Sequence, residues 1–214
     1  MERRLTAIFA LDMVGYGRLM ELDEAYTLAR HESIGAELFD PAISKHHGRL
    51  VKNTGDGFLA EFPSAVDAVE CAAEIQQGVS EHEADVATER RLAYRIGIAI
   101  GDIVAKDGDI YGGGVIIASR LESLAGPGQI LISDHAYGQV HNKVELGFED
   151  LGPHSVKNLQ KPLRVYRALW NPAAAAGPIA RAWRRHQTAA QVVLLAAVAI
   201  FTAWLIVPSR SALE

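Results

Sequence analysis

An Asp-Gly turn between two short apolar segments, within residues 49–62, constrains the fold of this chain more than any other feature. Gly55 and Gly57 can adopt positive φ without steric cost, so the pattern predicts a β-hairpin with Asp56 at its tip. An Asp-Gly pair is often only turn chemistry. The segment therefore predicts two adjacent antiparallel strands, and it leaves the role of Asp56 open.

A second aspartate, Asp12, follows the apolar segment 5–11 and precedes a turn that contains glycine, residues 13–17. A carboxylate in this position often caps the following helix. It can also hold a metal ion beside a phosphate, because the N–H groups at a helix start bind anions. If neighbouring strands bring Asp12 and Asp56 together, the two carboxylates form a site for two cations.

A third polar segment, residues 108–122, joins a glycine-rich loop to a predicted helix. Asp109 lies in the loop, and Arg120 lies two to three turns into the helix, where its cation projects back toward the loop. Each of the three segments is a weak signal by itself. Their presence in three separate elements of one chain favours a functional site.

These segments together resemble the catalytic domain of class III nucleotide cyclases, the adenylyl and guanylyl cyclase homology domain. Three patterns carry the resemblance in the family's order: Phe-x-x-Asp-x-x-Gly-Tyr at 9–16, Lys-x-x-x-Asp-Gly at 52–57, and Asp-Ile-Tyr-Gly followed by Ala-Ser-Arg at 109–120. The resemblance covers about residues 4–170, and bacterial members are the most similar. It implies a ferredoxin-like core.

The alternation of predicted strands and helices agrees with an α+β fold. We expect a mixed, mostly antiparallel sheet flanked by helices, with a helical region over 23–47 and a strong strand over 91–104. The formal net charge is −5, and the first 170 residues contain no basic stripe, so a nucleic-acid partner is not expected.

The resemblance also implies roles in metal and phosphate binding. Asp12 and Asp56, with the Met13 backbone carbonyl, would bind two divalent cations, Mg²⁺ or Mn²⁺. Arg120 would stabilise the charge that develops on the α-phosphate. The remaining phosphate contacts would come from the backbone of Val14, Gly15, Tyr16 and Gly17 and from the side chain of Lys157. Lys161 is close enough in sequence to be confused with Lys157, and either lysine can instead be a solvated surface charge.

Lys52 and Asp109 correspond to the base-selecting pair of adenylyl cyclases. A lysine donor suits N1 of adenine, and an aspartate acceptor suits the exocyclic amino group. Guanylyl cyclases of the family carry glutamate and a small or sulfur-containing residue there, because guanine inverts the donor and acceptor pattern. The expected substrate is therefore ATP, and a guanylate cyclase is disfavoured.

The expected function is conversion of ATP to 3′,5′-cyclic AMP and pyrophosphate at the interface of a homodimer. In the family, the metal-binding acids come from one subunit, and the base-selecting pair and the arginine come from the other. One position departs from the pattern, because Ile116 replaces the asparagine that orients the ribose. This replacement predicts a slow enzyme. The alternative is an inactive cyclase-like domain that binds nucleotide or acts as a regulatory dimerisation partner.

Residues 188–207 carry no charge and are long enough to cross a bilayer. Arg181, Arg184 and Arg185 precede them, with Trp183, which predicts a single membrane helix with its N-terminal side in the cytoplasm. A buried helix packed on the domain is the alternative. The expected organisation is a catalytic domain (1–170), a linker (171–187), a transmembrane helix (188–207) and a short extracytoplasmic tail (208–214). The expected location is the bacterial inner membrane, with the catalytic domain in the cytoplasm.

Overall fold

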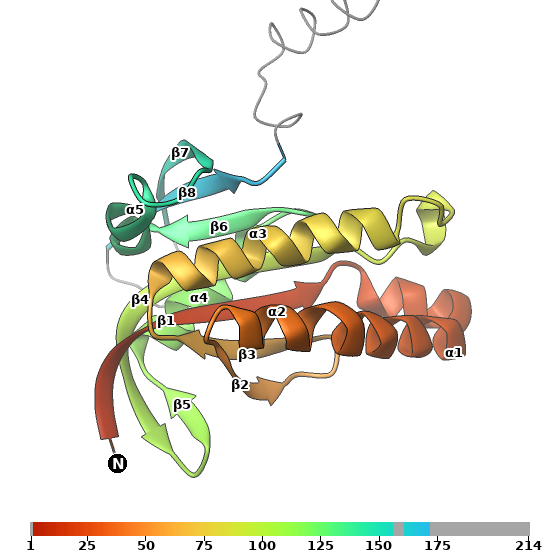
Figure 1. Cartoon of the computed structure of the whole chain (residues 1–214), viewed down its shortest axis with the longest axis horizontal. Helices are drawn as coiled ribbons and strands as arrows, with labels where there is room; N and C mark the ends of the chain where they lie inside the picture. Colours follow the sequence, from red (N-terminus) through yellow and green to blue (C-terminus); the bar gives the residue numbers. More distant parts are fainter. Residues whose placement is uncertain (1, 156–160, 172–214) are drawn as a thin grey trace, which may run out of the picture. The chain divides into compact units, whose positions relative to one another are not determined.

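The computed structural model describes residues 2–155 and 161–171. The chain divides into two units, Met1–Trp170 and Asn171–Glu214, and the fold described below is that of the first. The described residues form an eight-stranded sheet in the order β2-β3-β1-β4-β6-β8-β7, with β5 paired to β4 (Figure 1). The strands are β1 (Glu2–Met13), β2 (Arg49–Asn53), β3 (Gly57–Phe62), β4 (Tyr94–Lys106), β5 (Asp109–Tyr111), β6 (Ile130–Ser133), β7 (Gly147–His154) and β8 (Leu163–Leu169).

All of the strand pairs are antiparallel except β4 and β6, which run parallel. The predicted α+β fold with a mixed, mostly antiparallel sheet is confirmed. The hairpin over 49–62 is also confirmed, as β2 and β3.

Helices cover both faces of the sheet (Figure 1). The helical elements are α1 (Tyr16–Ile34), a π-helical turn (Gly35–Phe39), α2 (Asp40–Lys45), α3 (Ala65–His82), a 3₁₀ turn (Thr88–Arg90), α4 (Gly113–Leu124) and α5 (Asp134–Val140). Phe9 and Leu11 of β1 face a core shared with α1, α2, α3 and α5, whereas Ile8 and Ala10 face a second core under α4. This alternation follows from the two-residue period of a strand.

The helical region expected over 23–47 begins seven residues earlier, because α1 starts at Tyr16. Asp23 has extended backbone angles inside α1, and its carboxylate accepts a hydrogen bond from Tyr26 N at 3.1 Å. Asp23 therefore caps the second half of a kinked helix, which explains why the sequence pattern indicated a helix start there. The strand expected over 91–104 begins at Tyr94 and continues to Lys106.

In the part of the chain that the structure describes, no helix combines the length and the apolar character needed to cross a membrane. The predicted membrane segment, 188–207, the tail after it and the linker beyond residue 171 lie outside the described residues.

Candidate functional site

The strand pairing brings Asp12 and Asp56 to the same edge of the sheet. Asp12 on β1 is opposite Gly57 on β3, and Met13 N donates to the Asp56 carbonyl at 2.8 Å. The close approach depends on glycine, because a Cβ on Gly57 would lie 1.9 Å from the Leu11 carbonyl oxygen. A residue with a side chain at this position would separate the two strands that carry the acids.

The pKa of Asp12 depends on burial and on the charges of its neighbours. Burial raises the pKa of its carboxyl group above the ordinary value; a hydrogen bond from Arg95 opposes this, and the negative charge of Asp56 raises the pKa further. Two neighbouring carboxylates also favour a shared cation.

The donor set suits a hard divalent cation. Asp12, Asp56 and the Met13 carbonyl offer oxygen ligands, which Mg²⁺ and Mn²⁺ prefer. Among the described residues, no group of three or more His, Cys, Asp or Glu side chains is arranged to hold a metal ion. Two carboxylates completed by substrate phosphates and water are typical of Mg²⁺ in nucleotide enzymes. The residues therefore fit the two-cation site that the sequence predicts.

The turn after Asp12 leads directly into α1. Gly15 has φ +70 and is the N-cap of the helix, so the next residues start α1 with N–H groups that lack intrahelical acceptors. Val14 differs, because its N–H donates to the Ala93 carbonyl at 2.8 Å. In the predicted phosphate-binding loop, the amides that could bind phosphate are therefore those of Gly15, Tyr16 and Gly17, and the Val14 amide is excluded.

The structure also brings Lys52 and Asp109 together. Lys52 Nζ on β2 donates to Asp109 Oδ2 on β5 at 2.8 Å. The Lys52 ammonium lowers the pKa of Asp109. The other carboxylate oxygen of Asp109, Oδ1, accepts a hydrogen bond from Ile110 N at 2.7 Å. An ammonium donor and a carboxylate acceptor therefore lie side by side at a partly exposed position, as recognition of an adenine edge requires.

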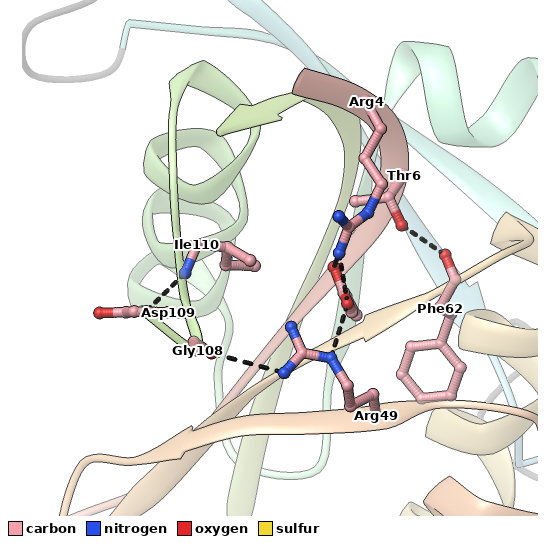
Figure 2. A network of polar contacts seen from close by, with 8 residues as sticks. Arg4, Thr6, Arg49, Phe62, Gly108, Asp109 and Ile110 are labelled. Carbon is pink, nitrogen blue, oxygen red and sulfur yellow. Dashed lines mark hydrogen bonds and ion pairs between the residues drawn. The ribbon is translucent and has the colours of Figure 1, made fainter. Parts of the chain in front are cut away.

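A network that the sequence analysis missed supports this pair (Figure 2). Glu61 is buried on β3 and accepts from Arg4 at 2.8 and 2.9 Å and from Arg49 Nε at 2.8 Å. Arg49 also donates to the Gly108 carbonyl at 3.4 Å, next to Asp109. The network ties β1, β2 and β3 to the β4–β5 turn and thereby helps to hold Asp109 near Lys52.

Helix α4 carries Arg120 and Ile116 and lies close to β4. A Cβ on Gly101 would lie 2.7 Å from Gly114 Cα, so both glycines are needed for this packing. Arg120 Nε is buried and has no hydrogen-bond partner among the described residues. The Ile116 side chain is 48% exposed and contains no hydrogen-bonding group.

Arg95 and Glu122 are two further residues that the sequence analysis missed. Arg95 Nε donates to Asp12 Oδ2 at 2.9 Å, and Glu122 Oε1 lies 2.6 Å from the same Arg95 nitrogen. Burial raises the pKa of Glu122 to about 7. The available signals were Arg95, which directly precedes the apolar segment 96–100, and Glu122, an acid two residues after Arg120.

The structure thus forms two groups, Asp12 with Asp56 and Lys52 with Asp109, and places Arg120 and Ile116 on α4. Lys157 lies outside the described residues. Lys161, the alternative phosphate ligand, is described and exposed.

Known proteins resemble this chain in sequence and in fold. The family model described as the adenylate and guanylate cyclase catalytic domain matches residues 3–168. A putative adenylate cyclase 3 of Rhizobium meliloti is 44% identical over 170 residues, which are 79% of this chain, and the chain spans 29% of that protein's length.

Two solved structures are also similar to this chain. An adenylate/guanylate cyclase/hydrolase from Silicibacter pomeroyi is 48% identical with a TM-score of 0.73, covering 79% of this chain and 98% of that one. The adenylyl cyclase CyaB from P. aeruginosa is 25% identical with a TM-score of 0.68, covering 79% and 96%.

Proposed function

The chain belongs to the family of adenylate and guanylate cyclase catalytic domains, and from this we propose that it converts ATP to 3′,5′-cyclic AMP and pyrophosphate. The observation that supports an adenine substrate is the 2.8 Å contact between Lys52 and Asp109. A guanine edge presents the opposite donor and acceptor pattern, so this pair disfavours GTP. The R. meliloti and P. aeruginosa relatives are named as adenylate cyclases.

The described residues suggest which groups bind the cations and which bind the phosphates. Asp12 and Asp56 would hold two cations, Mg²⁺ or Mn²⁺, with the Met13 carbonyl. Bound there, the cations would lower the barrier to deprotonation of the ribose 3′-hydroxyl and neutralise the leaving pyrophosphate. The amides of Gly15, Tyr16 and Gly17 would bind phosphate oxygens at the start of α1.

Arg120 would act as the catalytic cation, because its guanidinium can donate to an α-phosphate oxygen as negative charge develops. Loss of such a donor typically lowers the rate by about 10²–10³-fold. Ile116 cannot hold the ribose as an asparagine would, so the attacking oxygen would be poorly oriented and turnover slow.

We propose that the active unit is a homodimer, in which Asp12 and Asp56 of one subunit meet Lys52, Asp109 and Arg120 of the other.

We also propose that residues 188–207 form a membrane helix that anchors the domain on the cytoplasmic side of a bacterial inner membrane. Release of the full chain from membranes by alkaline carbonate would argue against this anchor.

Cyclic AMP formation by the full 214-residue chain, purified in detergent and assayed with ATP and Mn²⁺, tests the proposed activity. We expect slow product formation that Asp56→Ala abolishes and Ile116→Asn increases by about 10- to 100-fold, because the asparagine restores an orienting contact. The matched control is Asp85→Ala, which removes an exposed acid that has no role in the proposed site.

Absence of product from both the wild type and Ile116→Asn would contradict the enzymatic proposal. It would favour the second candidate, an inactive domain that binds nucleotide or regulates an active partner. The exposed, nonpolar Ile116 on α4 is the observation that favours this candidate.

A further inference from the structure

The β4–β5 hairpin, which carries Asp109, turns through an Asp-Gly pair. Asp107 and Gly108 both have positive φ, 52° and 83°, and Lys106 pairs with Asp109 across the turn. Two central residues with positive φ are typical of the tight hairpin turn whose twist matches that of the strands. The turn therefore fixes the direction of the Gly108 carbonyl relative to Asp109, the next residue along the chain.

Among the described residues, two hydrogen bonds join this hairpin to β2. One is the 2.8 Å contact from Lys52 to Asp109. The other runs from Arg49 Nη1 to the Gly108 carbonyl at 3.4 Å (Figure 2). The Lys52 ammonium also lies 5.9 Å from the centre of the Tyr111 ring. The hairpin is therefore held to β2 through two cations, Lys52 and Arg49.

A bound base would affect these two contacts differently. The proposed function assigns both Lys52 and Asp109 to adenine. N1 of the base would then compete with Asp109 for the Lys52 ammonium, and the exocyclic amino group would occupy an acceptor position on Asp109. The contact between Arg49 and Gly108 involves neither of these groups. It is therefore the link between β2 and the hairpin that remains when the base enters.

Glu61 fixes the direction of the Arg49 guanidinium. The two residues are cross-strand neighbours in the β2–β3 register, and Arg49 Nε donates to Glu61 Oε1 at 2.8 Å. Arg4 donates to both oxygens of the same carboxylate, at 2.8 and 2.9 Å. The Glu61 side chain is 10% exposed and that of Arg49 is 48% exposed, so the buried carboxylate is the fixed end of the contact. Because a guanidinium is planar, holding it at Nε also sets where Nη1 points.

We infer that Arg49 is a positioning residue for base selection: anchored by Glu61, it holds the Gly108 carbonyl and keeps Asp109 against the base. The inference rests on the proposed function, because it takes Lys52 and Asp109 as the groups that contact adenine. Loss of the Arg49 contact would let the β4–β5 hairpin move away from β2. Adenine would then lose its acceptor, whereas the proposed cation and phosphate ligands, which lie outside the hairpin, would remain.

A purely structural role for Arg49 makes a different prediction. If Arg49 only stabilised the sheet, its loss would weaken the binding of adenine and guanine nucleotides alike. If it positions Asp109, its loss weakens the binding of adenine nucleotides alone. Guanine presents a carbonyl oxygen where adenine presents its amino group, so a displaced Asp109 costs a guanine nucleotide nothing and relieves repulsion.

Isothermal titration calorimetry of the full chain in detergent with Mn²⁺ distinguishes the two roles, with 3′-deoxy-ATP and 3′-deoxy-GTP as ligands. Both lack the attacking hydroxyl, so the measurement reports binding and not turnover. We expect Arg49→Gln to weaken 3′-deoxy-ATP binding by about 10-fold, the usual effect of losing a hydrogen bond from a charged group. Binding of 3′-deoxy-GTP should be unchanged or tighter.

Two further variants test the anchor. Arg49→Lys should behave like Arg49→Gln, because one ammonium replaces the two nitrogens that contact Glu61 and Gly108 separately. Glu61→Gln should cause a smaller loss of 3′-deoxy-ATP binding and add nothing to Arg49→Gln, since both changes break one linkage.

Arg164→Gln is the matched control, because Arg164 forms an exposed ion pair with Asp150 on β7. Circular dichroism and the unfolding midpoint establish that each variant is folded; if Glu61→Gln does not fold, Arg49→Lys decides. Lys52→Ala is the positive control and should remove the preference for 3′-deoxy-ATP.

The outcomes separate the inference from the proposed function. If Lys52→Ala removes the preference but a folded Arg49 variant keeps it, the inference is overturned and the proposed function stands. Equal weakening of both nucleotides by Arg49→Gln also overturns the inference, because it indicates a general structural role. Equal or undetectable binding of the two nucleotides by the wild type would instead overturn the proposed base selection itself, and the inference with it.

Discussion

At the scale of single residues, the contact between Lys52 and Asp109 is the most direct link between this chain and its expected substrate. The two residues are 57 positions apart and meet only because the β4–β5 hairpin lies beside β2. The Lys52 ammonium lowers the pKa of Asp109, so the carboxylate remains an acceptor at neutral pH. A lysine donor and an ionised acceptor in contact favour adenine over guanine.

Exchange of the donor and acceptor roles at Lys52 and Asp109 should reverse the preference for ATP over GTP. We expect Lys52→Glu combined with Asp109→Cys to lower the ATP-to-GTP ratio of kcat/KM by about 100-fold or more, because polar groups that a bound base covers and leaves without partners discriminate strongly. The measurement is chromatographic separation of cyclic AMP and cyclic GMP made by the full chain. Lys45→Glu, at an exposed ion pair on α2, is the control. A double variant that retained the wild-type ratio would show that other groups read the base.

At the scale of elements, α1 packs on β4 through a half-buried histidine. His31 Nδ1 is 2.9 Å from the Tyr94 hydroxyl, and the two rings stack with centroids 5.8 Å apart. Burial lowers the pKa of His31, although the charges of Asp56 and Glu32 oppose this. Burial also raises the pKa of Tyr94, so its hydroxyl stays protonated and can donate to a neutral imidazole.

This packing predicts a pH-dependent stability. Because the pKa of His31 is lower in the folded state, the unfolded state binds the proton more tightly. The contribution of His31 to stability is therefore complete above its ordinary pKa of about 6.5 and decreases as pH falls below it. We expect the urea midpoint to fall more between pH 7.5 and pH 5.5 in wild type than in His31→Gln. The exposed His141→Gln should keep the wild-type dependence, and an identical fall in His31→Gln would contradict the prediction.

Two local predictions of structure, the hairpin and the start of the first helix, differ in outcome for a physical reason. The β2–β3 hairpin was predictable because its turn chemistry lies within a few residues. The start of α1 at Tyr16 was not, because glycines on both sides of it indicated a turn, and Asp23, which caps the second half of the helix, resembled the true start. Strand and helix ends depend on such competition between local signals and packing.

At the scale of the whole molecule, the proposed active site is divided between two copies of the chain. If Asp12 and Asp56 act with Arg120 of the partner, a dimer that carries one defect in each subunit keeps one intact site. Closed two-fold symmetry makes the two sites equivalent in the wild type.

Complementation tests this arrangement. We expect Asp56→Ala and Arg120→Ala to be inactive alone and, when co-expressed in equal amounts, to recover about one quarter of wild-type activity, because half of the dimers are mixed and each has one complete site. Asp12→Ala with Asp56→Ala is the matched control and should recover nothing, since both lesions affect the same side of the site. Absence of recovery in the first pair would contradict a shared site.

The sequence by itself determined the α+β class, the hairpin with Asp56 at its tip, the helix that carries Arg120 and the order of the motifs. These features depend on side-chain periodicity and turn chemistry over short distances, which a single sequence displays. Only the tertiary structure decided which charged groups meet. Arg95 reaches Asp12 across 83 positions, and Glu61 binds Arg4 across 57. Such contacts are set by strand register and by glycines that permit close packing, and neither leaves a local pattern in the sequence.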